Sequence, residues 1–215
     1  MLAAIACLIG IFGLLVIAEL LGKYKVLKGE YHRKFLHISA GSFIAFWPWL
    51  VSWGIIETFG LVALAVMLVN RYWSLLNYRG RIGRATYGDI FLALAISAAA
   101  FLTHSNVFFM VAILEVALAD GFAAVIGITY GKYWGYRVFG HSKTIIGSMV
   151  FWLSSVFILG VGLLPAHGLI PLQNYYLILL LAPPVFTIAE NVSLLGLDNL
   201  VIPLLTVAIL RLAQF

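Results

Sequence analysis

The chain has 215 residues, of which 64% are hydrophobic and only 10% are charged, and its mean hydropathy is +1.09. Soluble domains carry about 25% charged residues, so this composition excludes an ordinary soluble domain and indicates a single integral-membrane domain, 1–215. The formal net charge of +5 gives no indication of nucleic-acid binding, because cations beside a bilayer commonly set topology and contact membrane lipids.

Apolar segments of membrane-spanning length, which is about 20 residues, follow one another along the chain. They predict an all-α, polytopic membrane bundle of about eight transmembrane helices. In chain order the predicted helices cover roughly 2–22, 35–54, 55–70, 89–103, 107–130, 145–165, 175–190 and 198–213. Pro183 and Pro184 should break or kink the seventh helix, because proline removes a backbone donor.

Basic residues indicate how these helices are oriented. The first predicted helix has no basic residue before it and is followed by KYKVLKGEYHRK, the opposite polarity to a cleavable signal peptide. We therefore expect a retained helix with its N-terminus outside and the basic loops cytoplasmic. Those loops hold Lys23, Lys25, Lys28, Arg33 and Lys34; then Arg71, Arg79, Arg81 and Arg84; then Lys132, Arg137 and Lys143.

Two early motifs contain polar residues beside apolar runs. In HRKFLHISAG, Arg33 and Lys34 each share a helix face with His37. A lone histidine at this depth is more often a packing residue, but beside two cations it could bind phosphate or relay a proton. In RATYGDIF, a turn and helix cap explain Asp89 adequately.

The fifth predicted helix contains an acid, Asp120, well inside its apolar run. An ionisable group inside a span costs about 2.5–3.5 kcal/mol and is a functional hypothesis by default. Gly127 and Gly131 return to nearly the same helix face as Asp120. They leave either a smooth groove for a ligand or a small-residue ridge for helix packing.

HSKTIIGS precedes the sixth predicted helix and offers a cation, hydroxyls and a close backbone approach at Lys143, Thr144 and Gly147. The first turn of a helix favours phosphate, although a capped helix start with a snorkelling lysine is the alternative. Together with Asp120, the segment suggests a site for phosphate and a divalent metal, with the acid holding the metal.

GLDNLVIP begins the last predicted helix. Asp198 there suits a helix N-cap, while Asn199 and the earlier Glu190 offer further oxygen ligands. One aspartate cannot easily be both metal ligand and proton acceptor, so a second polar cluster would be chemically useful.

These motifs, in this order, resemble the membrane polyprenol kinase family of dolichol, phytol and farnesol kinases and the CTP-dependent diacylglycerol kinase. RKFLHISAG resembles its RKxxH helix, and YGDIFLALAI resembles the start of a later helix. ADGFAAVIGITYGK is similar to DxxAxxxGxxxG, HSKTIIGS to K[ST]xxGS and LDNLVIP to DNxxxP. Ile146 stands where many relatives have glutamate, which favours the phytol and farnesol type. Asp89 replaces a more usual glutamate.

The resemblance implies a kinase that transfers the γ-phosphoryl group of CTP to the hydroxyl of a long isoprenoid alcohol at the cytoplasmic interface. Mg²⁺ would be held by Asp120, assisted by Asp198, Asn199 or Glu190. The general base would be Asp89 or Asp198 rather than His37. The residues expected to contact the nucleotide are Lys132, Lys143, Thr144, Gly147, Ser148, Gly127, Gly131, Arg33, Lys34 and Asn199.

Other functions remain open at this point. A CTP-dependent diacylglycerol kinase would use the same motifs with another alcohol. A phosphatidate cytidylyltransferase would join a lipid phosphate to CMP, but its longer chain and acidic, glycine-rich ending are missing. A proton-coupled transporter would use the acids Glu115 and Asp120, yet it needs polar residues on both membrane faces, whereas here they gather on one.

Overall fold

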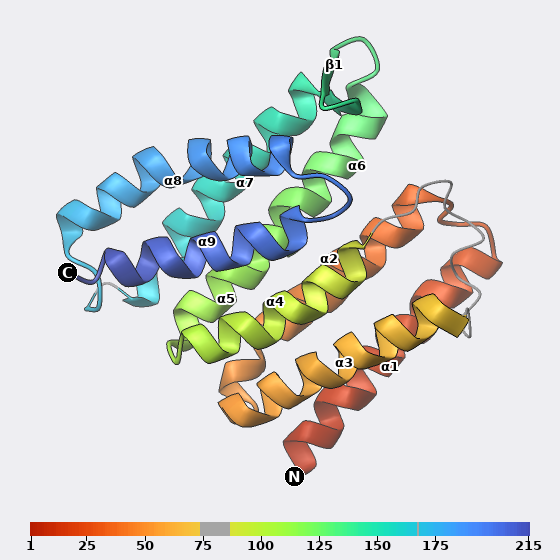
Figure 1. Ribbon diagram of the computed structural model, residues 1–215, viewed down its shortest axis with the longest axis horizontal. Coiled ribbons are helices and arrows are strands. Elements are labelled where there is room, and N and C mark those ends of the chain that lie inside the picture. Colours follow the sequence, from red (N-terminus) through yellow and green to blue (C-terminus); the bar gives the residue numbers. More distant parts are fainter. Residues whose placement is uncertain (74–86, 167) are drawn as a thin grey trace.

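The computed structural model describes residues 1–73, 87–166 and 168–215 (Figure 1). Arg79, Arg81 and Arg84 of the second basic loop lie outside the described residues. The helices are α1 (Leu2–Lys23), α2 (Glu30–Ala45), α3 (Trp53–Trp73), α4 (Gly88–Leu102), α5 (Asn106–Leu114), α6 (Asp120–Tyr130), α7 (Ile145–Gly162), α8 (Leu172–Val192) and α9 (Asp198–Leu212). Two 3₁₀ turns, Trp47–Trp49 and Leu164–Ala166, lie between helices.

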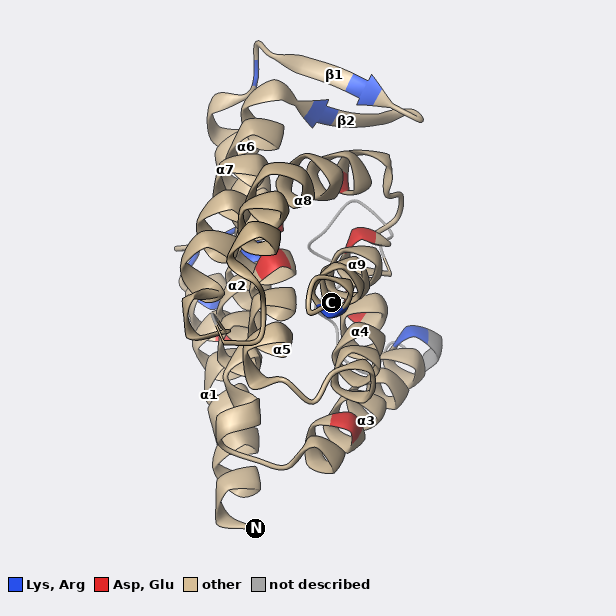
Figure 2. Cartoon of the chain, turned by 90° about the vertical axis from the view of Figure 1, so that its left-hand side faces the viewer, with Lys and Arg blue, Asp and Glu red and all other residues tan. Residues whose placement is uncertain are grey.

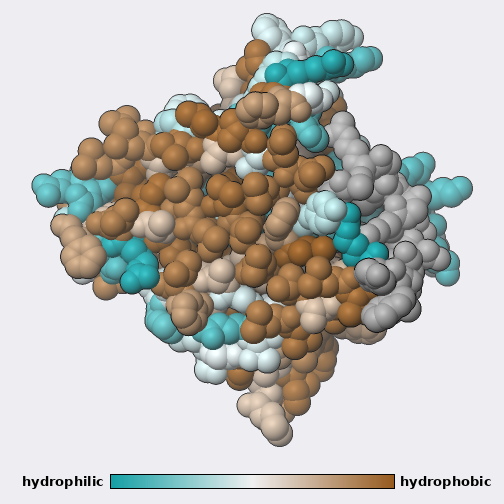
Figure 3. Space-filling view, viewed as in Figure 1, coloured by the Kyte–Doolittle hydropathy of each residue, from teal (hydrophilic) through white to brown (hydrophobic). Residues whose placement is uncertain are grey.

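The helical membrane bundle predicted from the sequence is confirmed. Five stretches within the described residues are long and apolar enough to cross a membrane: 2–23, 53–71, 106–130, 145–162 and 172–192. Eight spans and the orientation in the membrane stay predictions. Hydrophobic side chains cover most of the face seen in Figure 3, which suits contact with lipid.

A central helical rod, formed by α5, α6 and the turn between them (106–130), lies in the middle of the bundle. In Figure 1, α1 to α4 occupy one side of the molecule and α7 to α9 the other, with α5 and α6 running between them. The rod contacts α2, α7 and α9, and six consecutive α5 side chains, Phe108 to Ile113, are buried. Because so much of the rod is enclosed, its two acids, Glu115 and Asp120, face protein rather than lipid.

The rod is continuous but not uniform. Between α5 and α6 the chain makes one π-helical turn, Glu115–Ala119, which inserts an extra residue relative to an α-helix. Glu115 in this turn is fully buried, and its Oε2 accepts a 2.7 Å hydrogen bond from Ser155 on α7. The turn sits immediately before Asp120.

The predicted bounds of the second helix are wrong. The second helix was expected over 35–54, but α2 begins at Glu30 and ends at Ala45. Pro48 explains the early end, because proline has no backbone N–H to donate to the carbonyl group four residues before it and its ring clashes with that turn. The sequence predicted a break or a kink at Pro183 and Pro184; the break does not occur, because α8 is helical throughout, and the kink stays a prediction. Prolines are tolerated in membrane helices when surrounding groups satisfy the backbone.

A small β-hairpin also departs from the all-α expectation. β1 (Gly135–Val138) pairs antiparallel with β2 (His141–Thr144), and Tyr136 lies opposite Lys143. The turn residues Phe139 and Gly140 have positive φ angles of 47° and 81°, as the favoured two-residue hairpin turn requires. The hairpin leads directly into α7 and so fixes where Lys143 lies.

Candidate active site

Three carboxylates that are far apart in the sequence meet at one end of the bundle. Asp120 begins α6, Glu190 lies near the end of α8, and Asp198 begins α9. One carboxylate oxygen from each lies within 4.8 Å of the others. Figure 2 shows the acidic positions of α8 and α9 next to each other below the hairpin. These are the three residues that the sequence predicted as metal ligands.

Asp120 is held from the α2 side. Lys34 Nζ donates to Asp120 Oδ2 at 2.5 Å, and both side chains are buried. His37 Nε2 lies 3.5 Å from the same oxygen and 2.9 Å from the Val116 carbonyl oxygen. A carbonyl only accepts hydrogen bonds, so His37 Nε2 carries a hydrogen. The sequence pattern predicted Lys34 and His37 as site residues but did not predict that they would pair with Asp120.

Glu190 is held from the hairpin side. Lys143 Nζ forms an ion pair with Glu190 Oε1 and donates to the Glu190 carbonyl oxygen at 3.1 Å. Burial alone would lower the pKa of Lys143, but the Glu190 carboxylate raises it above its ordinary value. Lys143 is therefore charged at neutral pH. Through Glu190, Lys143 and Asp120 belong to the same cluster.

Asp198 differs from the other two carboxylates. Among the described residues it has no ion-pair partner, and its Oδ1 accepts a 3.0 Å hydrogen bond from the Asn199 backbone N–H. The predicted N-cap role is wrong, since the N-cap is Leu197 and Asp198 is the first residue of α9. Asp198 is half-buried and so is the most accessible acid of the three.

Arg33 lies beside this cluster but is already paired. Its Nε donates to Glu30 Oε2 at 3.1 Å within the first turn of α2, and the two side chains form an ion pair. Glu30 was not singled out from the sequence, although its position three residues before Arg33 is a signal for such a pair.

The expected groove along α6 is filled by protein. A Cβ atom at Gly127 would lie 2.8 Å from Thr144 Oγ1 and 3.3 Å from Gly147 Cα, and one at Gly131 would lie 2.6 Å from Thr144 Cβ. Thr144 is the N-cap of α7, its Oγ1 accepting a 3.0 Å hydrogen bond from the Gly147 N–H. The ligand-groove interpretation of these glycines is therefore wrong, and helix packing explains them.

This packing predicts the effect of adding one methyl group. Gly127→Ala should lower the thermal unfolding midpoint in detergent, because overpacking of this kind costs about 1–3 kcal/mol. Gly13→Ala in α1 is the control, since a Cβ there meets nothing within 4 Å and alanine favours helix. Equal unfolding midpoints for the two variants would contradict the packing assignment.

Ser148 belongs to a hydroxyl and amide cluster that the sequence did not reveal. Its Oγ lies 2.5 Å from the Tyr136 hydroxyl and donates to Asn191 Oδ1 at 3.1 Å, while the Tyr136 hydroxyl also donates to Asn191. The cluster fastens β1 and the start of α7 to the end of α8. The position of Asn191 next to Glu190 was the only available sequence signal.

The remaining predicted residues lie around the cluster. Asn199 is buried and its Nδ2 donates to the Gly88 carbonyl oxygen at 2.9 Å, which joins α9 to the start of α4. In the described part of the chain its Oδ1 has no hydrogen-bond partner. Asp89, half-buried in the first turn of α4, is not one of the three clustered carboxylates. Lys132 is exposed, with Nζ 5.9 Å from the Tyr133 ring centroid.

Comparison with known proteins supplies independent information. A phytol kinase of Synechocystis sp. is 32% identical to this chain over 197 residues, covering 87% of this chain and 81% of that protein. No protein-family model matches the sequence. No solved structure matches it either.

Proposed function

Because the chain belongs to the membrane polyprenol kinase family that includes phytol kinase, we propose that it transfers the γ-phosphoryl group of CTP to a long-chain isoprenoid alcohol. The observation that carries the proposal is the meeting of three carboxylates with Lys34 and Lys143 at one end of the bundle. The choice of CTP rests on the resemblance described above. We place the reaction at the cytoplasmic interface, where the basic loops are expected.

The donor set suits Mg²⁺. Carboxylate oxygens are the hard ligands that this ion prefers, and ligand oxygens at about 2.1 Å from an octahedral ion are separated by about 3 to 4 Å. The three carboxylates, within 4.8 Å of one another, need only a small closure. Asp120, Glu190 and Asp198 would hold the ion, which when bound supplies charge neutralisation to the triphosphate.

The two lysines have a second role in this proposal. Lys34 and Lys143 each occupy a carboxylate that the metal would use, and an ion held by those oxygens would compete with the ammonium groups. We propose that the two lysines change partners when metal and nucleotide bind. Each ammonium group would release its carboxylate, Asp120 or Glu190, and bind a phosphate oxygen of the nucleotide instead. Metal and nucleotide would then bind cooperatively, because each binding event frees the groups that the other requires.

The acceptor alcohol needs a proton acceptor more than it needs a pocket. Its tail can remain in lipid, with the hydroxyl raised to the interface, and a positioned base would contribute about 10²–10⁴-fold. Asp89 is the acid proposed for this role, and Asp198 would take it only if Asp120 and Glu190 hold the ion without it. We rank these acids ahead of His37, whose Nε2 donates to the Val116 carbonyl oxygen and so cannot accept a proton.

The proposal predicts a defined product pattern. Purified full-length protein with Mg²⁺, each of four nucleoside triphosphates and a panel of phytol, farnesol, dolichol and diacylglycerol should release CDP and a phosphorylated isoprenoid alcohol. Nucleotide consumption and lipid products would both be measured. Pyrophosphate release would identify a cytidylyltransferase instead, phosphorylation of diacylglycerol alone would identify the other kinase, and no nucleotide consumption would favour a carrier.

A further inference from the structure

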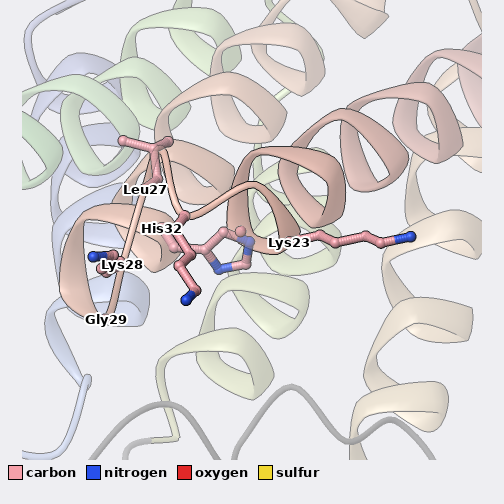
Figure 4. Close-up of a pocket in the computed structure, with 7 residues that line it drawn as sticks. Lys23, Leu27, Lys28, Gly29 and His32 are labelled. Carbon is pink, nitrogen blue, oxygen red and sulfur yellow. The ribbon is translucent and has the colours of Figure 1, made fainter.

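We infer that the chain has a second anion site, separate from the carboxylate cluster, that binds the phosphate of an anionic membrane lipid. The site is a pocket of about 580 Å³ between the end of α1 and the start of α2. Its lining residues are Gly22, Lys23, Lys25, Leu27, Lys28, Gly29 and His32 (Figure 4). None of these residues was assigned to the kinase reaction.

The pocket concentrates positive charge, and its described lining contains no acid. It is lined by three lysines, and none of the three forms an ion pair with any residue that the structure describes. The neighbouring acid Glu30 is already paired with Arg33. Like charges gathered around one cavity repel one another, so binding an anion would relieve this repulsion.

The walls of the pocket are held in place, whereas the lysine side chains are exposed. His32 Nε2 lies 2.9 Å from the Ala18 carbonyl oxygen and links α2 to α1. Lys25 and Gly29 have positive φ angles of 59° and 54°, which set the course of the loop. In Figure 4 the His32 ring lies between Lys28 and Lys23, and the Lys23 side chain extends away from the ring. Because Lys23 is exposed, it could turn towards a ligand.

The position of the pocket at the end of α1 favours a lipid over a soluble anion. Apart from Glu19 and its last residue, Lys23, α1 is apolar, and few of its residues are buried. Large side chains such as Ile9, Phe12 and Leu20 are exposed on it and would face acyl chains. A phospholipid lying along α1 would therefore present its phosphate at the level of the lysines.

The pocket is distinct from the proposed active site although both use α2. Lys34 directs its ammonium group to Asp120 on α6, whereas His32 bonds to α1. The two sites consequently lie against different neighbours of α2, and lipid binding can be measured without nucleotide or turnover. Failure of this inference would leave the proposed kinase reaction unaffected, and the reverse also holds.

The test measures thermal unfolding of the full chain in neutral detergent while dioctanoyl phosphatidylglycerol is added. We expect this lipid to raise the unfolding midpoint, and dioctanoyl phosphatidylcholine to have a much smaller effect. In the double variant Lys25→Gln/Lys28→Gln, the half-saturating concentration should rise roughly 25-fold, since each lysine near an anionic surface contributes about fivefold. The control double variant Arg137→Gln/Arg211→Gln removes two cations elsewhere and should change it less than about twofold.

Three outcomes would overturn the inference. An unchanged half-saturating concentration in the lysine variant would remove the pocket as the site. An equal loss in the arginine variant would show a general effect of net charge. Stabilisation by inorganic phosphate at the same concentrations as the lipid would identify a soluble anion instead.

Discussion

Replacing Asp120 with asparagine is expected to reduce phosphoryl transfer by about 100- to 1000-fold. Asparagine keeps the shape of the side chain but removes the negative charge at the centre of the three-carboxylate cluster. Phosphoryl transfer depends mainly on positioning and charge stabilisation, and loss of one stabilising group commonly costs about 10²–10³-fold. The measurement is transfer of labelled γ-phosphate to the alcohol. Near-normal turnover would contradict the assignment of Asp120 as a metal ligand.

A second variant separates chemistry from folding in this experiment. Lys34 is only 3% exposed, and removing the partner of a buried charge costs about 3–5 kcal/mol. Asp120→Asn alone should therefore also lower the unfolding midpoint. The double variant Asp120→Asn/Lys34→Gln removes both charges and should recover much of that stability while remaining inactive. Activity in the double variant would count against the role of Asp120.

Replacing Lys143 with alanine is expected to produce two opposite changes in affinity. The KM for CTP should rise about 10- to 100-fold, as loss of a hydrogen bond from a charged group to phosphate would cause. In the absence of nucleotide, the affinity for Mn²⁺ should increase, because Glu190 no longer has an ammonium partner. Electron paramagnetic resonance of free and bound Mn²⁺ measures the second change without turnover.

Arg137→Ala is the matched control, because Arg137 is an exposed cation on β1 of the same hairpin. It should change neither quantity by more than about twofold. A KM unchanged by Lys143→Ala would remove the phosphate role. A Mn²⁺ affinity that falls in that variant would contradict the exchange of partners.

The three acids of the site could be predicted from the sequence because of their surroundings. A carboxylate is costly inside or beside an apolar run, so Asp120, Glu190 and Asp198 stand out from the residues on either side of them. Their partners could not be assigned in the same way. Lys34 and Asp120 are 86 residues apart, and only the packing of α2 against α6 brings them together. The spacing of residues within a motif does not predict a pair between residues so far apart in the sequence.

Local features without a strong pattern were also missed. The hairpin is formed by two strands of four residues each, too short for alternation to distinguish them from an irregular loop. The small residues Gly127 and Gly131 suit a ligand groove and a packing ridge equally well by spacing alone. The position of Thr144 and Gly147 against them decides between the two.

The π-helical turn between α5 and α6 determines the direction in which the Asp120 side chain points. An α-helix rotates about 100° per residue, so Glu115 and Asp120 would point about 140° apart in an uninterrupted helix. Both are instead buried within the bundle. The extra residue in the π-helical turn reduces the angle between the two side chains around the helix axis. Inserting one further residue into that turn would rotate the Asp120 carboxylate by about 100° and away from Lys34. Function could thus be lost while every residue that touches the substrate is left intact.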